Sequence, residues 1–130
     1  MNIKNSYPSP LIMKKIYITD GEFHRSDNIM DDVDLSVHVR RRIGNMEDNL
    51  YRVELKIDIE DKDKTLSVSA KCTGIFETEV EQRVLIERNA IAIMFPYLRS
   101  YISTLTTVPG ISPIILPPMN IAAMIAREEE

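Results

Sequence analysis

The sequence predicts an α+β fold in which a four-stranded antiparallel, meander-like sheet precedes a long proline-interrupted helix, an extended proline-rich connector and a short C-terminal helix. Three observations support this prediction. Apolar and polar residues alternate with period two through much of the first half of the chain, which is typical of strands with one buried face. Apolar residues then recur at spacings of three and four, as on one face of a helix. Paired prolines separate this stretch from a last apolar segment.

Four segments carry the strand pattern, namely residues 16–23, less regularly, and residues 33–39, 51–59 and 66–72. The turns at 44–49 and 61–64 are short and polar. Short polar turns favour hairpins, so we expect the second strand to pair with the third and the third with the fourth. The acidic stretch from Asp27 to Asp34 is expected to form a looser connection after the first strand.

The first helix is predicted from a stripe of apolar residues, Ile91, Met94, Leu98, Tyr101, Ile102, Leu105 and Val108. Pro96 lies inside this stripe, and proline removes a backbone donor and clashes with the preceding turn. We therefore expect a break near Phe95. Ile93, Phe95 and Tyr97 add apolar surface on other sides of the helix, more than one sheet can cover. This predicts a helix sandwiched between the sheet of its own subunit and another subunit.

The connector and the last helix follow from prolines and a capping residue. Pro117 and Pro118 force extended geometry on the preceding aliphatic residues, because a proline disfavours the helical region for its neighbour. Asn120 is expected to cap the short last helix. Its apolar face would carry Ile121, Met124 and Ile125, and the final three glutamates, at 128–130, should fray because they meet the negative end of the helix dipole.

Length and composition indicate one domain, residues 1–130, of ordinary globular character. The net charge is −4, which argues against nucleic acid as the main partner. The single Cys excludes an intramolecular disulfide and favours a reducing compartment. The chain has no apolar stretch of signal-peptide or membrane-spanning character. We therefore expect a cytoplasmic protein that does not insert into membranes.

No residue pattern predicts catalysis, a cofactor or a metal site. His24 and His38 have no carboxylate or thiol partner at a motif-like spacing, so surface histidines are the better interpretation. Cys72 falls in the inward phase of the fourth strand and is expected to be a small buried hydrophobe. The acidic residues Asp27, Asp31, Asp32 and Asp34 lack the glycine and glutamate of an EF-hand loop. The arginines at 40–42 are interpreted as a solvated strand end rather than a phosphate site.

Several motifs resemble the SecB family of export chaperones. The segment Phe95-Pro96-Tyr97-Leu98-Arg99 is similar to the family's opening of the long helix. Gly74-Ile75-Phe76 resembles the end of its fourth strand, and Pro118-Met119-Asn120 the start of its last helix. Ile16-Tyr17 and Asp20, shortly before Phe23, are similar to its first strand. The order and spacing agree from about Ile16 to Ile125, nearly the whole chain.

The resemblance implies an ATP-independent holdase, a non-enzymatic tetramer built as a dimer of dimers, that binds unfolded preproteins and delivers them to the SecA motor. The peptide-binding grooves would be lined by Phe76, Phe95, Tyr97, Tyr101, Ile115, Leu116, Met119 and Ile121. Asp20 would belong to the partner-docking surface. On this reading Leu116→Asp is expected to weaken binding of unfolded substrate without dissolving the assembly.

Two alternatives remain open at this point. Ser69 stands where the family's docking surface has an acidic residue, and some SecB-like proteins serve as dedicated chaperones for an antitoxin. This chain could have one such client. The second alternative is a small α+β enzyme or ligand-binding domain with a pocket between sheet and helices, for which the sequence lacks convergent polar groups.

Overall fold

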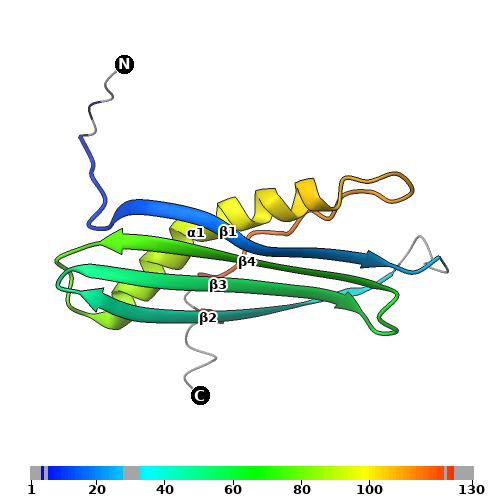
Figure 1. The fold of residues 1–130 in the computed structure, drawn as a ribbon, viewed down its shortest axis with the longest axis horizontal. Helices are drawn as coiled ribbons and strands as arrows, with labels where there is room; N and C mark the ends of the chain where they lie inside the picture. Colours follow the sequence, from blue (N-terminus) through cyan, green and yellow to red (C-terminus); the bar gives the residue numbers. More distant parts are fainter. Residues whose placement is uncertain (1–3, 5, 28–32, 122, 125–130) are drawn as a thin grey trace.

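The computed structural model describes residues 4, 6–27, 33–121 and 123–124. Within this part of the chain lie four strands and a long helix, in the order β1 (Ile12–Arg25), β2 (Leu35–Glu47), β3 (Leu50–Asp61), β4 (Leu66–Glu77) and α1 (Arg83–Leu105). The strands form one antiparallel sheet in the order β1-β4-β3-β2. Helix α1 lies on one face of this sheet, and the segment after it returns along the same side (Figure 1). The predicted α+β class, the four-stranded antiparallel sheet and the two predicted hairpins are confirmed, but the sheet is not a full meander, because β1 lies beside β4 rather than beside β2.

The strands extend beyond the alternating segments, and the connection at 44–49 is shorter than expected. β2 continues to Glu47, which pairs with Leu50 across a two-residue turn. The side-chain amide of Asn45 donates to the carbonyls of Asp48 and Leu50 at 3.1 and 3.3 Å. Asp48 has a φ of 41°, which Asp and Asn tolerate better than most residues. Polar residues therefore close this hairpin, next to a register shift between Asn45 and Glu47.

β1 pairs with β4 at one edge of the sheet, away from β2 at the other edge. Its alternation is irregular because the register shifts between Ile18 and Asp20. Before the shift, Ile16 and Ile18 lie opposite the inward positions of β4, and after it Gly21 and Phe23 do so. An extra residue at a β-bulge reverses the phase of all residues beyond it. This bulge explains why the first strand is difficult to recognise from period alone.

The three arginines of β2 divide between the two faces of the sheet. Arg40 and Arg42 are exposed on the outer face, the one opposite α1, as expected. Arg41 instead points inward and forms an ion pair with Glu87 of α1, with 8 and 13 % of the two side chains exposed. A solvated strand end is therefore wrong for Arg41. The helix supplies the buried carboxylate that makes an inward arginine tolerable.

Helix α1 runs from Arg83 to Leu105 without a break, so the break expected near Phe95 is wrong. Pro96 lies on the exposed side of the helix, where the unpaired carbonyl of Ala92, itself exposed, can reach water. Met94 and Leu98, on either side of the proline, are fully buried against the sheet. Burying two such side chains gains about 3–6 kcal/mol, which offsets the roughly 3 kcal/mol cost of an interior proline.

Two glycines allow close contact between the sheet and its inner cover. Gly74 lies under the ring of Phe76, and a Cβ there would lie 3.0 Å from the sulfur of Met94. A Cβ at Gly21 would overlap the hydroxyl of Tyr101. The absence of a side chain at both positions lets the core close around α1.

Asn120 caps the start of the last helix, as predicted. Its side-chain oxygen accepts a hydrogen bond from the Ala123 amide at 2.9 Å, and its carbonyl accepts one from the Met124 amide at 3.0 Å. The first contact satisfies an amide of the first turn that lacks an intrahelical partner, and the second is the first backbone hydrogen bond of the helix. The expectations for Asp31, Asp32, Ile125 and residues 128–130 lie outside the described residues.

Candidate functional site

An open groove lies between β2 and the segment that starts the last helix. It encloses about 620 Å³ and is lined by Val37, His38, Val39, Met119, Asn120, Ala123 and Met124. Val37 and Val39 are half-buried on the inner side of β2. Met119 and Met124 face them with flexible, polarisable thioether side chains, which adapt to partners of different shape. The groove therefore has a mostly apolar lining, to which His38 and Asn120 add polar groups and no Asp, Glu, Lys or Arg of the described residues contributes.

The groove lies beside an edge of the sheet, because β2 is the last strand in the order β1-β4-β3-β2. An edge strand carries backbone N–H and C=O groups that can pair with an added strand. Strand addition gives affinity through these groups, and adjacent pockets select alternate side chains. Among the described residues no strand lies on the outer side of β2, and this free edge together with the groove suits an extended polypeptide segment with large apolar residues.

The connector is fixed to the end of α1 through Thr106, which is fully buried. The Thr106 hydroxyl donates to the carbonyl of Ile102 and accepts a hydrogen bond from the Ile114 amide, both at 2.8 Å. Ser103 adds a hydrogen bond to the Ile114 carbonyl at 3.0 Å. These hydrogen bonds hold the connector in an extended conformation, so that adjacent side chains point alternately to the core and to solvent.

The residues predicted to bind peptide fall into two groups. Phe76, Phe95 and Leu116 lie in the core of the chain, with 0, 6 and 3 % of their surface exposed. Their role as client contacts is therefore not supported by the single chain. For Leu116 the burial reverses the expected result of Leu116→Asp, because a carboxylate in the core should prevent folding rather than weaken binding alone.

The other predicted residues are more accessible. Tyr97 and Ile115 are 50 and 78 % exposed, Met119 lines the groove, and Ile121 is half-buried against the core. Tyr101 is also half-buried and lies over Gly21 of β1. The structure thus brings only Met119 of the predicted set into the groove itself.

Sequence reasoning missed the β2 side of the groove. Val37 and Val39 carry a strand pattern, and that pattern correctly predicts which way they point. It cannot predict that α1 packs mainly on β1, β3 and β4 and meets β2 at Arg41 and Ile43, at the other end of that strand. The position of the helix leaves this part of the inner face open to the C-terminal segment.

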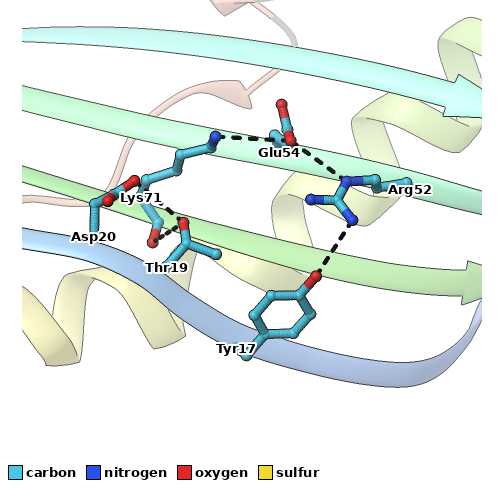
Figure 2. A network of polar contacts seen from close by, with 6 residues as sticks. All are labelled: Tyr17, Thr19, Asp20, Arg52, Glu54 and Lys71. Carbon is cyan, nitrogen blue, oxygen red and sulfur yellow. Dashed lines mark hydrogen bonds and ion pairs between the residues drawn. The ribbon is translucent and has the colours of Figure 1, made fainter.

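The outer face of the sheet carries a network of polar contacts (Figure 2). Glu54 accepts from Arg52 at 3.4 Å and lies 3.7 Å from the ammonium of Lys71. Arg52 also donates to the Tyr17 hydroxyl at 3.3 Å. Asp20, the predicted partner-docking residue, is exposed and lies opposite Lys71 in the ladder. This face is polar and solvated, in contrast to the apolar groove.

Two titratable side chains of the described residues have shifted pKa values, and contacts within the fold cause both shifts. Burial raises the pKa of the Cys72 thiol to about 11, and this cysteine is a buried inward residue of β4 as predicted. Hydrogen bonds from the Thr65 hydroxyl and the Leu66 amide lower the pKa of Asp61. Asp61 thereby closes the turn between β3 and β4. Neither group faces the groove.

No helix in the described ranges combines the length and the apolar character that crossing a bilayer requires.

Comparison with known proteins identifies a family and relatives that match most of the chain. The family described as "Preprotein translocase subunit SecB" matches residues 4–130. An uncharacterized protein of Methanocaldococcus jannaschii is 37 % identical over 106 residues, which cover 75 % of this chain and 68 % of that protein. "Protein-export protein SecB" of Rickettsia akari is 31 % identical over 104 residues, covering 74 % of this chain and 67 % of the relative.

A solved structure has the same fold. It is the Mycobacterium tuberculosis SecB-like chaperone in complex with a ChAD peptide from the HigA1 antitoxin. The superposition has a TM-score of 0.69 and covers 84 % of this chain and 90 % of that one, at 11 % sequence identity. At this identity the likeness concerns the arrangement of the sheet and helix.

Proposed function

The chain belongs to the SecB family, and on that premise we propose that it is a chaperone that holds unfolded polypeptide without ATP and without making or breaking a bond. The observation that carries this proposal is the open apolar groove beside the free edge of β2. An unfolded segment would place apolar side chains between Val39 and Met119 while its backbone pairs with the strand edge.

A carboxylate placed in the groove tests this role. Ala123 is exposed, lines the groove and lies in the capped last helix, so Ala123→Asp changes the groove with little effect on the core. Ser112→Asp is the matched control, because it adds the same charge at an exposed position of the connector. We expect Ala123→Asp to weaken binding of a fluorescent unfolded reporter chain by about tenfold or more, since desolvating a charge against an apolar segment is costly.

Unchanged binding by Ala123→Asp, or equal weakening by both variants, would place the client site elsewhere. Circular dichroism and solution mass of both variants separate loss of binding from loss of folding. Turnover of a small metabolite that Ala123→Asp abolishes would instead support the small-enzyme alternative.

We further propose that subunits assemble through the side of α1 that faces away from its own sheet. Three large side chains are partly exposed on this side of the helix or at its margins, namely Val84 (44 %), Leu85 (41 %) and Tyr97 (50 %). Ala92 and Ser100 are also exposed and are small enough for another helix to approach closely. A homotetramer, a dimer of dimers, has an expected mass of 4 × 14.9, or about 60 kDa. Native mass spectrometry that finds only monomer would contradict this assembly.

Membership of the family is compatible with two kinds of client, many different preproteins or one dedicated protein. Relatives named as protein-export proteins favour preproteins as clients. The chain would deliver such clients in the cytoplasm to SecA, which would dock on an outer-face residue such as Asp20. The Mycobacterium tuberculosis neighbour, which carries an antitoxin peptide, favours a single dedicated client. Affinity capture from the native host distinguishes the two, because many unrelated presecretory chains indicate export and one dominant partner indicates a dedicated role.

A further inference from the structure

The outer face of the sheet carries a row of three cations on adjacent strands. Arg40 of β2 pairs with Lys56 of β3, and Lys56 pairs with Lys71 of β4. Side chains directly opposite each other in an antiparallel ladder are close neighbours, and like charges at such positions destabilise the sheet. The row is therefore an electrostatic cost that the fold alone does not explain.

Carboxylates of the same face neutralise this row incompletely. Glu54 is shared between Arg52 and Lys71, at 3.4 and 3.7 Å. Asp58 lies 3.9 Å from Arg40, whose side chain remains 75 % exposed. No carboxylate of the described residues lies within ion-pair distance of Lys56.

The neighbouring register positions extend the positive charge toward one end of the sheet. Arg42 lies opposite Glu54, and Arg52 and Lys15 occupy the next row, on either side of Ile75. Together with the first row, these positions form a band that we call the cationic band, with six cations and two carboxylates: Lys15, Arg40, Arg42, Arg52, Lys56 and Lys71 against Asp20 and Glu54. A shallow depression of about 250 Å³ lies over its centre.

The opposite end of the same face is acidic. The row beyond Lys56 contains Asp58 and Glu22, and the next contains Glu60. The cationic band is therefore short and is bounded by negative charge at this end. A long polyanion such as nucleic acid would extend from the cations onto these carboxylates, whereas a short acidic peptide would contact the cations alone.

From this charge arrangement we propose that the cationic band docks an acidic segment of a partner polypeptide. The segment would place several Asp or Glu side chains beside Arg40, Lys56 and Lys71, which relieves the repulsion between them. This surface lies on the face of the sheet opposite the apolar groove, so the chain could hold a client and an acidic partner together. The proposal does not depend on the client role.

Binding of a fluorescently labelled oligoglutamate peptide, followed by anisotropy, tests the proposal. Oligolysine and oligothymidine of similar length serve as comparison probes. The triple variant Arg40→Gln, Lys56→Gln, Lys71→Gln removes the row. The matched control Lys4→Gln, Lys62→Gln, Lys64→Asn removes three charges from exposed positions elsewhere; asparagine suits Lys64, whose φ is 55°.

We expect oligoglutamate to bind more tightly than either comparison probe and to dissociate as salt is raised. The row variant should lose about tenfold or more in affinity, and the control should lose much less. Both should still bind the unfolded reporter chain, so failure here is distinguishable from failure of the client groove. Absent oligoglutamate binding, equal losses in both variants, or tighter binding of oligothymidine would each overturn the proposal.

The free protein provides an independent readout. Lys56→Glu places a carboxylate between Arg40 and Lys71, so it should raise the midpoint of thermal unfolding while it weakens oligoglutamate binding. A merely structural row would not give opposite changes in stability and binding. If Lys56→Glu lowers the midpoint while it leaves binding intact, the row is not a docking surface.

Discussion

Leu116 and Ile115 are adjacent on the connector but have opposite environments, which makes them a matched pair for mutagenesis. Leu116 is 3 % exposed and belongs to the core, whereas Ile115 is 78 % exposed. Leu116→Ala removes three buried carbon atoms, and at about 0.8 kcal/mol per methylene the transfer cost alone is about 2.4 kcal/mol. Incomplete closure of the resulting cavity raises the expected loss in the free energy of unfolding to about 3–4 kcal/mol.

Ile115→Ala removes the same number of carbons from a side chain that is mostly in water already. Its expected loss of unfolding free energy in the single chain is about 0.5 kcal/mol or less. The difference between the two variants should therefore exceed about 2 kcal/mol. The hydrogen bonds that hold the Ile114 backbone to α1 keep the two neighbours from exchanging places.

Urea unfolding followed by circular dichroism measures both values. All proteins are compared at one chain concentration, because assembly adds a concentration-dependent contribution to apparent stability. Equal losses in the two variants, or a loss below about 1 kcal/mol for Leu116→Ala, would show that Leu116 is not core. Binding of unfolded reporter chain should be reduced in Ile115→Ala only if Ile115 joins the client surface.

Three further predictions concern single positions. Cys72 should resist a thiol reagent at pH 8 in the native protein and react once urea unfolds it, because burial holds its pKa at about 11; rapid native labelling would contradict this. Asp61 has a lowered pKa, so its contribution to stability is complete above the pKa of an unfolded aspartate and is lost as pH falls through the folded pKa. Acid titrations of wild type and Asp61→Asn should therefore converge at low pH, and a constant gap would refute the role of the Thr65 hydrogen bond. Gly21→Ala should cost about 1–3 kcal/mol because the added Cβ overlaps Tyr101, and Tyr101→Leu in the same chain should recover part of the loss; additive losses would exclude the overlap.

The interior of the sheet was predictable from local pattern. Residues 51–59 and 66–72 alternate strictly, and they are the central strands, covered on their inner face. Period two is reliable here because one face is fully buried and a slip of one residue would expose every apolar side chain. The cap at Asn120 was predictable for a similar reason, since it depends only on neighbours along the chain.

The irregular positions were less predictable because non-local contacts determine them. The bulge between Ile18 and Asp20 reverses the phase of β1, and nothing in the local composition requires it. Arg41 lies in the inward phase of β2, and its burial is tolerated only because α1 brings Glu87 to it from 46 residues away. Pro96 remains within a continuous helix because packing against the sheet outweighs its local cost.

For the candidate site, the sequence determined the chemistry and the tertiary structure decided the geometry. The apolar connector, the two methionines at 119 and 124 and the motif around Pro96 are properties of the chain, and they suffice to indicate the family and an apolar binding surface. Only the folded chain separates Leu116 from Ile115, leaves Val37 and Val39 open beside a free edge, and aligns Arg40, Lys56 and Lys71 in one row. The reason is physical: periodicity records which way a residue points from its own element, whereas exposure and charge pairing depend on which other elements lie against it.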